Sequence, residues 1–401
     1  MKIAIVSVAF NRLLSITRLI SSLQKADYES DKVDLIISID KSNTDVVESY
    51  ADGVSWPYGE KIVVKHEKNL GLRAHIMSQG KHFQNYDALV ILEDDIIVSP
   101  LFYHYTKQAL TKYQNNKDIA GISLYAYYVN YQNNLPFEPI KTEFDAYFMQ
   151  CAMSWGQVWM KNQWMEFYEW YQNHLDFDYS PAIPQSLYGW PKSSWLKYHI
   201  RYCIENKKYF VYPYFSLVTD FSDVGTHNDD ATNNTVYQVP MQRGNKTDFN
   251  FPETPNDSIR YDGFFENESI AHVLGVAEDD LCIDLYGTRG NKTNNRFWLT
   301  TSIQNFKIVK SFGINYRPIE CNIIEENAGH QIFLYDTSIV EKNPYKEHNL
   351  NVLFRFYIQS TFTFMRIYGI KGYFTHPIII TFKKIIKAVR KKILRNDIRR
   401  F

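Results

Sequence analysis

Three consecutive acids, Glu93-Asp94-Asp95, are the residues of this chain whose types and spacing point most directly to chemistry. They follow the apolar run 88–92 and precede Ser99-Pro100, where we expect a helix cap and the first helical residue. The acids would then lie at the carboxyl end of a buried strand, where open α/β sheets bind ligands. Carboxylate oxygens without a nearby Cys or His pair suit Mg²⁺ or Mn²⁺, ions that usually also hold substrate phosphates. A solvated acidic turn is the alternative that the triplet alone leaves open.

Four apolar strands that alternate with helical patterns must position these acids. The expected strands are residues 2–10, 34–40, 61–67 and 87–92, and the expected helices cover residues 13–23 and 74–86. The strands are nearly continuous in Val, Ile and Leu, which is typical of strands buried on both faces of a parallel sheet. The sequence therefore predicts an α/β fold with crossover helices over residues 1 to 125. It contains no GxGxxG or GxxxxGK[ST] turn, which disfavours Rossmann dehydrogenases and P-loop NTPases.

Length and composition indicate a globular, enzyme-sized protein. The chain has 401 residues, of which 45% are hydrophobic and 16% aromatic, and this argues against disorder. We see no N-terminal signal and no apolar run of about 18 residues, so we expect a cytosolic chain. The cysteines are too widely spaced for a zinc site or a disulfide framework, and we expect them to be reduced; they are Cys151, Cys203, Cys282 and Cys321.

Aromatic residues dominate the second third of the chain. Six tryptophans lie between residues 125 and 230, and we consider Trp155, Trp190 and Trp195 as the acceptor side of a binding pocket. Packing in the core is the commoner role for any one tryptophan, because each ring buries a large area. Residues 231–350 are rich in loop formers, with strand patterns at 306–311 and 331–334, and the sequence assigns this region no role.

Four short segments, taken in chain order, resemble the donor-binding segments of nucleotide-sugar-dependent GT-A glycosyltransferases. They are Phe10-Asn11-Arg12, Ser38-Ile39-Asp40, Asn69-Leu70-Gly71-Leu72-Arg73 and Glu93-Asp94-Asp95. In detail the chain is similar to the animal β-1,2-N-acetylglucosaminyltransferase of N-glycan synthesis and to bacterial family-2-like transferases of surface polysaccharide synthesis. The likeness spans about residues 1 to 230 and includes the Trp-Gly segment 152–159 and Gly225-Thr226-His227. It implies a GT-A fold, a mostly parallel twisted sheet flanked by helices.

The resemblance also implies roles for single residues. Asp95 would ligate the metal that bridges the donor diphosphate, Asp94 would lie near the ribose, and Glu93 would support the loop. A divalent cation can neutralise the charge that develops on a departing nucleoside diphosphate.

Further donor contacts follow from the same resemblance and from side-chain chemistry. Phe10, Arg12 and Asp40 would contact the nucleotide base and ribose. The fork of Arg73 suits a phosphate, although a solvated arginine is nearly as good an interpretation. His227 is a candidate second ligand for the metal or a phosphate, because a neutral imidazole can coordinate.

The catalytic base is the point where this chain departs from the pattern. Relatives place an Asp before a Trp at the start of a helix, whereas this chain has Ser194 before Trp195. An inverting transferase needs a carboxylate to accept the proton of the attacking hydroxyl. We take Asp220 and Asp223 as substitutes for the missing base, and Asp176 and Asp178 as the second choice. Whether the reaction inverts or retains the anomeric configuration stays open.

The last 51 residues are strongly basic. Residues 351–401 contain twelve Lys or Arg and one acid, a net charge of +11, which leaves −11 for the rest of a neutral chain. From residue 377 onward, apolar residues fall on one helical stripe and basic residues occupy the remainder. This pattern predicts an interfacial helix on an anionic membrane surface. A solvated basic helix and nucleic-acid binding are the alternatives, and we favour the membrane.

The expected organisation is therefore a GT-A catalytic domain at 1–230, with a nucleotide-sugar half at 1–125 and an acceptor half at 126–230. A loop-rich accessory region at 231–350 and the basic tail at 351–401 would follow. We expect a glycosyltransferase, using Mn²⁺ or Mg²⁺, that moves a sugar from a UDP-sugar to a lipid-linked saccharide in bacterial surface polysaccharide synthesis. It would sit on the cytoplasmic face of the cell membrane and bind no nucleic acid. A non-catalytic saccharide-binding protein descended from a transferase is the alternative, and a sugar-phosphate nucleotidyltransferase is a weaker one because Phe10-Asn11-Arg12-Leu13 lacks a glycine.

Overall fold

The structure is a computed structural model that describes residues 1–221, 223, 237–289 and 294–345. Contacts divide the chain into one compact unit, Met1–Tyr345, and a second unit, Lys346–Phe401. The second unit, which contains the predicted basic tail, lies outside the described residues, as does His227. Within the described ranges, no helix combines the length and the apolar character needed to span a membrane.

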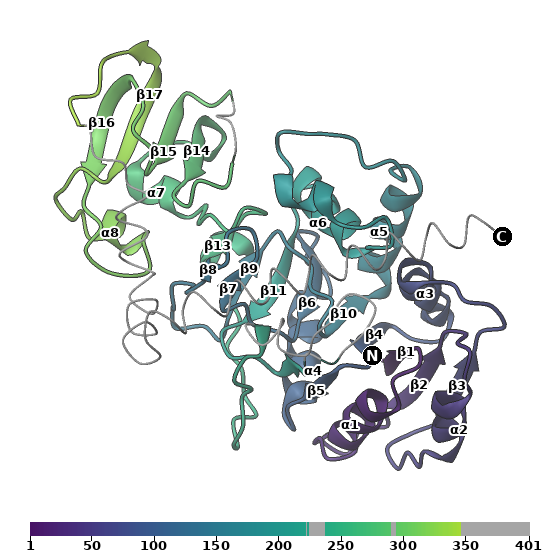
Figure 1. The fold of residues 1–401 in the computed structure, drawn as a ribbon. Helices are drawn as coiled ribbons and strands as arrows, with labels where there is room; N and C mark the ends of the chain where they lie inside the picture. The colour runs from purple at the N-terminus through teal and green to yellow at the C-terminus, as the bar shows by residue number, and fades with distance from the viewer. Residues whose placement is uncertain (222, 224–236, 290–293, 346–401) are drawn as a thin grey trace, which may run out of the picture. The chain divides into compact units, whose positions relative to one another are not determined.

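A mixed, mostly parallel sheet of nine strands forms the centre of the described unit (Figure 1). Its strands, in spatial order, are β13 (Arg260–Tyr261), β9 (Ala146–Met149), β11 (Tyr209–Pro213), β6 (Ile119–Ser123), β10 (Gln157–Met160), β4 (Ala88–Glu93), β1 (Ile3–Ala9), β2 (Asp34–Ile39) and β3 (Lys61–Lys65). The neighbours β4, β1, β2 and β3 are all parallel, which confirms the predicted α/β architecture of the first third. Strand β10 runs antiparallel to both of its neighbours, β4 and β6.

Helices and short 3₁₀ turns connect these strands. They are α1 (Leu13–Leu23), α2 (Val46–Gly53), α3 (Leu72–Ser78), η1 (Gln79–Gln84), α4 (Phe102–Tyr113), α5 (Lys161–Gln172), η2 (Gln185–Gly189) and α6 (Leu196–Glu205). Helix α1 buries one apolar stripe formed by Ile16, Leu19, Ile20 and Leu23, as its helical spacing predicts. Helices α5 and α6 pack against each other (Figure 1).

Two local predictions need correction. A short strand, β5 (Ile96–Val98), follows the acids and pairs with β12 (Val218–Asp220), so the next helix, α4, begins at Phe102 instead of at Pro100. The hydroxyl of Ser99 donates to the carbonyl oxygen of Gln242, at 2.6 Å, and accepts from the N–H of Leu101, at 3.2 Å, in the turn that precedes the helix. Strand β3 is half-buried because it is the last strand of the sheet, and so it is not covered on both faces as predicted.

The region after residue 230 both extends the large sheet, through β13, and forms a second sheet. The second sheet has the order β14 (Leu281–Asp284), β15 (Phe297–Thr300), β17 (Ile332–Val340) and β16 (Phe306–Phe312). The two predicted strands near residues 306 and 331 are confirmed. The remaining short elements are β7 (Val129–Asn130), β8 (Leu135–Pro136), η4 (Pro255–Asp257), α7 (Ile270–Leu274), η5 (Glu278–Asp280) and α8 (Cys321–Ile324).

Candidate active site

An arginine and two aspartates meet where the neighbouring strands β1 and β4 end. Val8 and Glu93 are register partners in these parallel strands, so the residues that follow each strand emerge at the same edge of the sheet. There Nη2 of Arg12 contacts Oδ1 of Asp94 and lies 3.0 Å from Oδ2 of Asp95. The backbone N–H of Phe10 also donates to Asp94. The structure thus brings four of the sequence-predicted site residues together.

Several carboxylate oxygens of this cluster are buried without a hydrogen-bond partner among the described residues. They are Oε1 of Glu93, Oδ2 of Asp94 and Oδ1 of Asp95. A buried, unpaired carboxylate oxygen is costly, and a hard cation is the partner that satisfies it best. No group of three or more His, Cys, Asp or Glu side chains arranged to hold a metal occurs in the described part of the chain. An ion of the Mg²⁺ type needs only one or two protein carboxylates beside water and substrate phosphates, and the unpaired oxygens of Asp94 and Asp95 could supply these.

Burial and repulsion shift the titration of these groups. Burial raises the pKa of Asp94 to about 6, although the nearby charge of Arg12 acts in the opposite direction. Burial also raises the pKa of Glu93 well above its ordinary value, with further contributions from Asp95 and Asp94. Burial by itself would lower the pKa of Arg12, but attraction to the two aspartates more than offsets it and raises that pKa. The cluster thus carries a net negative charge, and Arg12 holds its aspartates in place.

Asp40 and the loop before α3 form a second part of the predicted donor site. The two carboxylate oxygens of Asp40 accept hydrogen bonds from the backbone N–H groups of Leu70, at 2.8 Å, and Gly71, at 2.9 Å. Gly71 adopts a φ of +74°, which glycine tolerates without the strain that a Cβ brings. Asp40 therefore positions the loop from which Arg73 projects, and no ribose contact is needed to explain its burial. Nη1 of Arg73 donates to the hydroxyl of Tyr198, at 3.0 Å.

The two aspartates predicted as catalytic occupy different settings. Asp220 ends β12, is buried, and lies next to the acids, since the N–H of Phe221 donates to the carbonyl oxygen of Asp95 at 2.9 Å. Asp223 instead accepts a hydrogen bond from the hydroxyl of Ser15, at 2.6 Å, and pairs with Arg18 on α1. Asp220 is thus the one placed beside the cluster, whereas Asp223 ties its own segment to α1.

The three predicted acceptor-side tryptophans differ in exposure. Trp155 is half-buried, with its ring centroid 5.1 Å from that of Tyr125 and 5.3 Å from that of Tyr237. Trp190 is half-buried against Tyr131, at 5.5 Å. Trp195 is only 1% exposed, so it packs in the core and presents no surface to an acceptor.

Lys197, which our sequence analysis did not select, lies in the first turn of α6 and is 5% exposed. It lies three residues after Ser194, where the resemblance seen in the sequence leads us to expect an Asp. The departure from the family pattern at Ser194 was therefore the signal that could have directed attention to this turn.

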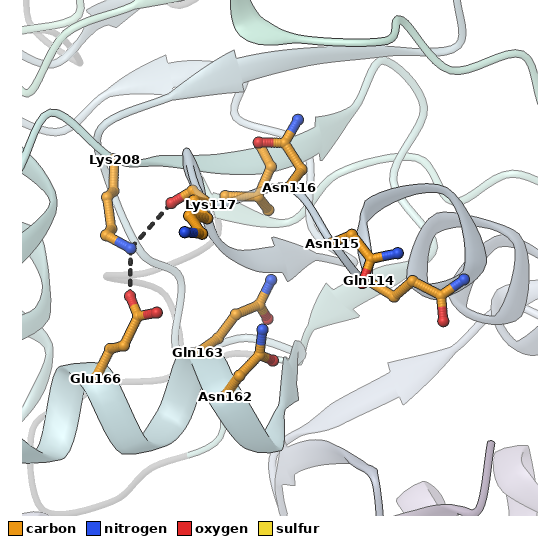
Figure 2. Close-up of a pocket in the computed structure, with 9 residues that line it drawn as sticks. Gln114, Asn115, Asn116, Lys117, Asn162, Gln163, Glu166 and Lys208 are labelled. Carbon is orange, nitrogen blue, oxygen red and sulfur yellow. Dashed lines mark hydrogen bonds and ion pairs between the residues drawn. The ribbon is translucent and has the colours of Figure 1, made fainter.

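A small pocket of about 180 Å³ lies at the opposite edge of the sheet (Figure 2). It is lined by residues at the amino end of β6 and the start of α5, including Ile119 and Asn162. Lys208 forms an ion pair with Glu166 and donates to the carbonyl oxygen of Lys117, at 2.9 Å (Figure 2). Because the acids follow the carboxyl end of β4, this pocket is separate from the candidate active site.

No family model and no curated relative matches this chain. Similar solved structures include Staphylococcus aureus TarS 1-349, at 14% identity and a TM-score of 0.32 over 53% of this chain and 60% of that chain. They also include the mannosyltransferase PcManGT from Pyrobaculum calidifontis in complex with GDP-Man and Mn²⁺, at 13% identity and a TM-score of 0.35 over 56% of this chain and 59% of that one. GalNAc-T7 with UDP, GalNAc and Mn²⁺ matches at 13% identity and a TM-score of 0.37 over 53% of this chain and 42% of that one.

These three solved structures are remote from this chain in sequence and in fold. The chain matches less than two thirds of the length of each. Likenesses this remote carry no argument about substrate, metal or activity. The chain has a mixed α/β fold with a large, mostly parallel central sheet flanked by helices, as expected for GT-A proteins.

Proposed function

We propose that this protein is a metal-dependent glycosyltransferase that uses a nucleotide-sugar donor. One observation carries the proposal: Arg12, Asp94 and Asp95 converge at the carboxyl ends of β1 and β4, with carboxylate oxygens left unpaired. This is the edge of an open α/β sheet at which ligands bind. A divalent cation there would neutralise charge on a departing diphosphate.

In this proposal each described residue has a defined task. Asp95, assisted by Asp94, would hold Mn²⁺ or Mg²⁺. Arg12 orients both carboxylates before the ion binds. Asp40 fixes the loop that leads to Arg73, which can contact a phosphate. Asp220 is the carboxylate nearest to the cluster by backbone contact and is our candidate to accept the acceptor hydroxyl proton.

The finer assignments rest on composition and on the sequence resemblance. We propose a UDP-sugar donor and a lipid-linked saccharide acceptor in bacterial surface polysaccharide synthesis. The basic tail would hold the protein on the inner face of the membrane, because its lysines and arginines are attracted to anionic lipids and its apolar stripe can enter the interface. Nucleic acid is not proposed as a partner.

The second candidate function is a saccharide-binding protein without catalysis. Ser194 in place of an acid favours it, as does the presence of a lysine instead of a carboxylate in the first turn of α6. Metal-dependent hydrolysis of a nucleotide sugar separates the two functions, because a binding protein should show none.

The central test is a thermal-shift screen of nucleotide sugars with and without Mn²⁺. A ligand that binds only the folded state raises the melting temperature, and the rise grows with the ratio of ligand concentration to Kd. Asp95→Asn should abolish the Mn²⁺-dependent part of the shift, because it removes a charged ligand. Asp52→Asn is the matched control, since Asp52 lies on α2 and pairs with Lys65 at the surface. An unchanged shift in Asp95→Asn would overturn the proposed site.

A further inference from the structure

Two cationic side chains, Arg73 on α3 and Lys197 on α6, meet at one tyrosine ring. The guanidinium carbon of Arg73 lies 5.4 Å from the ring centroid of Tyr198, and Nζ of Lys197 lies 5.6 Å from the same centroid. Arg73 also donates to the hydroxyl of Tyr198, at 3.0 Å. Both cations therefore contact one aromatic side chain, and the charge of Arg73 acts on Lys197.

Neither cation has a carboxylate partner among the described residues. The polar contact of the Lys197 ammonium is the carbonyl oxygen of Trp190, at 3.2 Å, and its other neighbour is the ring of Phe177, at 4.9 Å. Burial lowers the pKa of Lys197, and the charges of Arg73 and Lys192 lower it further. Two like charges in partly apolar surroundings raise the free energy of the folded state, and an anion placed between them would lower it.

Topology places this pair at the edge of the sheet that carries the acids. Helix α3 follows β3, so it begins at the carboxyl edge of the parallel strands. Helix α6 leads into β11, which is parallel to β6, so α6 ends at the amino edge and begins near the carboxyl edge. Both cations lie in the first turn of their helices, so both lie near this edge of the sheet.

We propose that Arg73 and Lys197 form a phosphate-binding subsite that takes one phosphate of a diphosphate substrate. The guanidinium supplies a planar fork for phosphate oxygens and the ammonium supplies a compact charge. The inference deepens the proposed glycosyltransferase function and rests on it for the identity of the substrate. A diphosphate could come from the nucleotide donor or from a lipid-linked acceptor, and the experiment separates these sources.

The first arm measures binding of inorganic pyrophosphate to the full-length chain by titration calorimetry. Arg73→Gln and Lys197→Gln should each weaken binding about tenfold or more, the loss expected for one charged hydrogen-bonding group. Lys197→Arg should retain most of the affinity. Lys25→Gln, which changes an exposed lysine just after α1, is the matched control and should leave the affinity within about twofold, as exposed charges contribute little. Unchanged affinity in both folded Gln variants would overturn the subsite.

The second arm tests whether Lys197 only supports the fold. Without ligand, Lys197→Gln should melt at the same temperature as the parent or higher, because one of two neighbouring like charges is removed. If Lys197 instead serves only to hold Trp190 and Phe177, the variant melts lower while pyrophosphate binding persists, and the proposal fails.

The third arm identifies the source of the diphosphate. If Arg73→Gln and Lys197→Gln lose UDP binding in the presence of Mn²⁺, the subsite belongs to the donor. If they lose geranyl diphosphate binding instead, it belongs to a lipid-linked acceptor. Asp95→Asn should leave pyrophosphate binding intact. If the parent binds pyrophosphate but shows no Mn²⁺-dependent nucleotide binding, the proposed function alone fails. If the parent binds nucleotide and both Gln variants keep the parent's pyrophosphate affinity, the subsite alone fails.

Discussion

At the scale of single residues, this protein buries several carboxylates wholly or in part and pairs only some of them with a positive charge. Arg12 compensates Asp94 and Asp95 at the candidate active site, where it pairs with both carboxylates. Glu320 is compensated differently. It is 2% exposed and accepts hydrogen bonds from the hydroxyls of Tyr261, at 3.0 Å, and Tyr286, at 3.5 Å, and no cation of the described residues pairs with it. Ionised Glu320 therefore carries an electrostatic cost that no nearby cation offsets among the described residues.

That cost makes the stability depend on pH. Burial raises the pKa of Glu320 from 4.5 to about 7, so the folded state binds more protons than the unfolded state between these values. Stability therefore falls as pH rises through this window, by about 3 kcal/mol at most. Glu320→Gln removes the charge; its amide oxygen still accepts from one tyrosine hydroxyl, and its NH2 group can donate to the other. The variant should melt higher than the parent at pH 8 but close to it at pH 4.5, as followed by thermal denaturation.

Glu325→Gln, which changes an exposed acid next to α8, is the matched control and should show no such difference between the two pH values. Equal gains for Glu320→Gln at both pH values would contradict the assignment of the cost to a buried charge.

At the scale of elements, the middle of the sheet depends on close packing around β6. Gly121 lies on this strand between Trp159 of β10 and Phe210 of β11. A Cβ at Gly121 would meet Phe210 Cζ at 2.5 Å and Trp159 Cδ1 at 2.7 Å. The glycine thus lets two large rings cover the strand, and it helps to fix the sheet that orders β4 and the acids after it.

Gly121→Ala should therefore lower the free energy of unfolding by about 1–3 kcal/mol, the usual range for overpacking a core. Chemical denaturation measures this loss. Gly53→Ala is the control, because a Cβ there at the end of α2 meets nothing within 4 Å. It should be neutral or stabilising by up to about 1 kcal/mol, since alanine is the better helix former. A Gly121→Ala variant as stable as the parent would show that the rings can move aside.

At the scale of the whole molecule, charge is divided unevenly along the chain. Residues 1–350 carry −11 and residues 351–401 carry +11. A near-neutral total therefore hides a basic segment suited to an anionic surface and an acidic remainder that would be repelled from it. This division supports the proposal that the last segment sets where the protein acts.

Cosedimentation with vesicles tests this role. The full chain should sediment with vesicles that contain phosphatidylglycerol, and a chain that ends at residue 376 should stay in solution. Vesicles of phosphatidylcholine alone are the control, and binding to them should be weak. Each lysine or arginine near an anionic surface contributes about 1 kcal/mol to binding, and neutral lipid does not supply this contribution. Binding of the shortened chain to anionic vesicles at the level of the full chain would exclude the tail as the anchor.

The sequence by itself determined the first four strands, helix α1 and the acidic segment after β4. These features depend on local hydrophobic patterns, which the chain carries without reference to distant residues. It also placed Arg12 and Asp94 in one site, because neighbouring parallel strands end at one edge of the sheet.

Only the tertiary structure decided contacts between segments that are far apart in the chain. It joined Asp223 to α1, put Trp195 in the core, and brought Lys197 to the same ring as Arg73. It also inserted β5 before α4, because β5 exists only by pairing with β12, more than a hundred residues away. No local pattern encodes such pairs, since side-chain type does not reveal which distant surface will cover a residue or leave a charge without a partner.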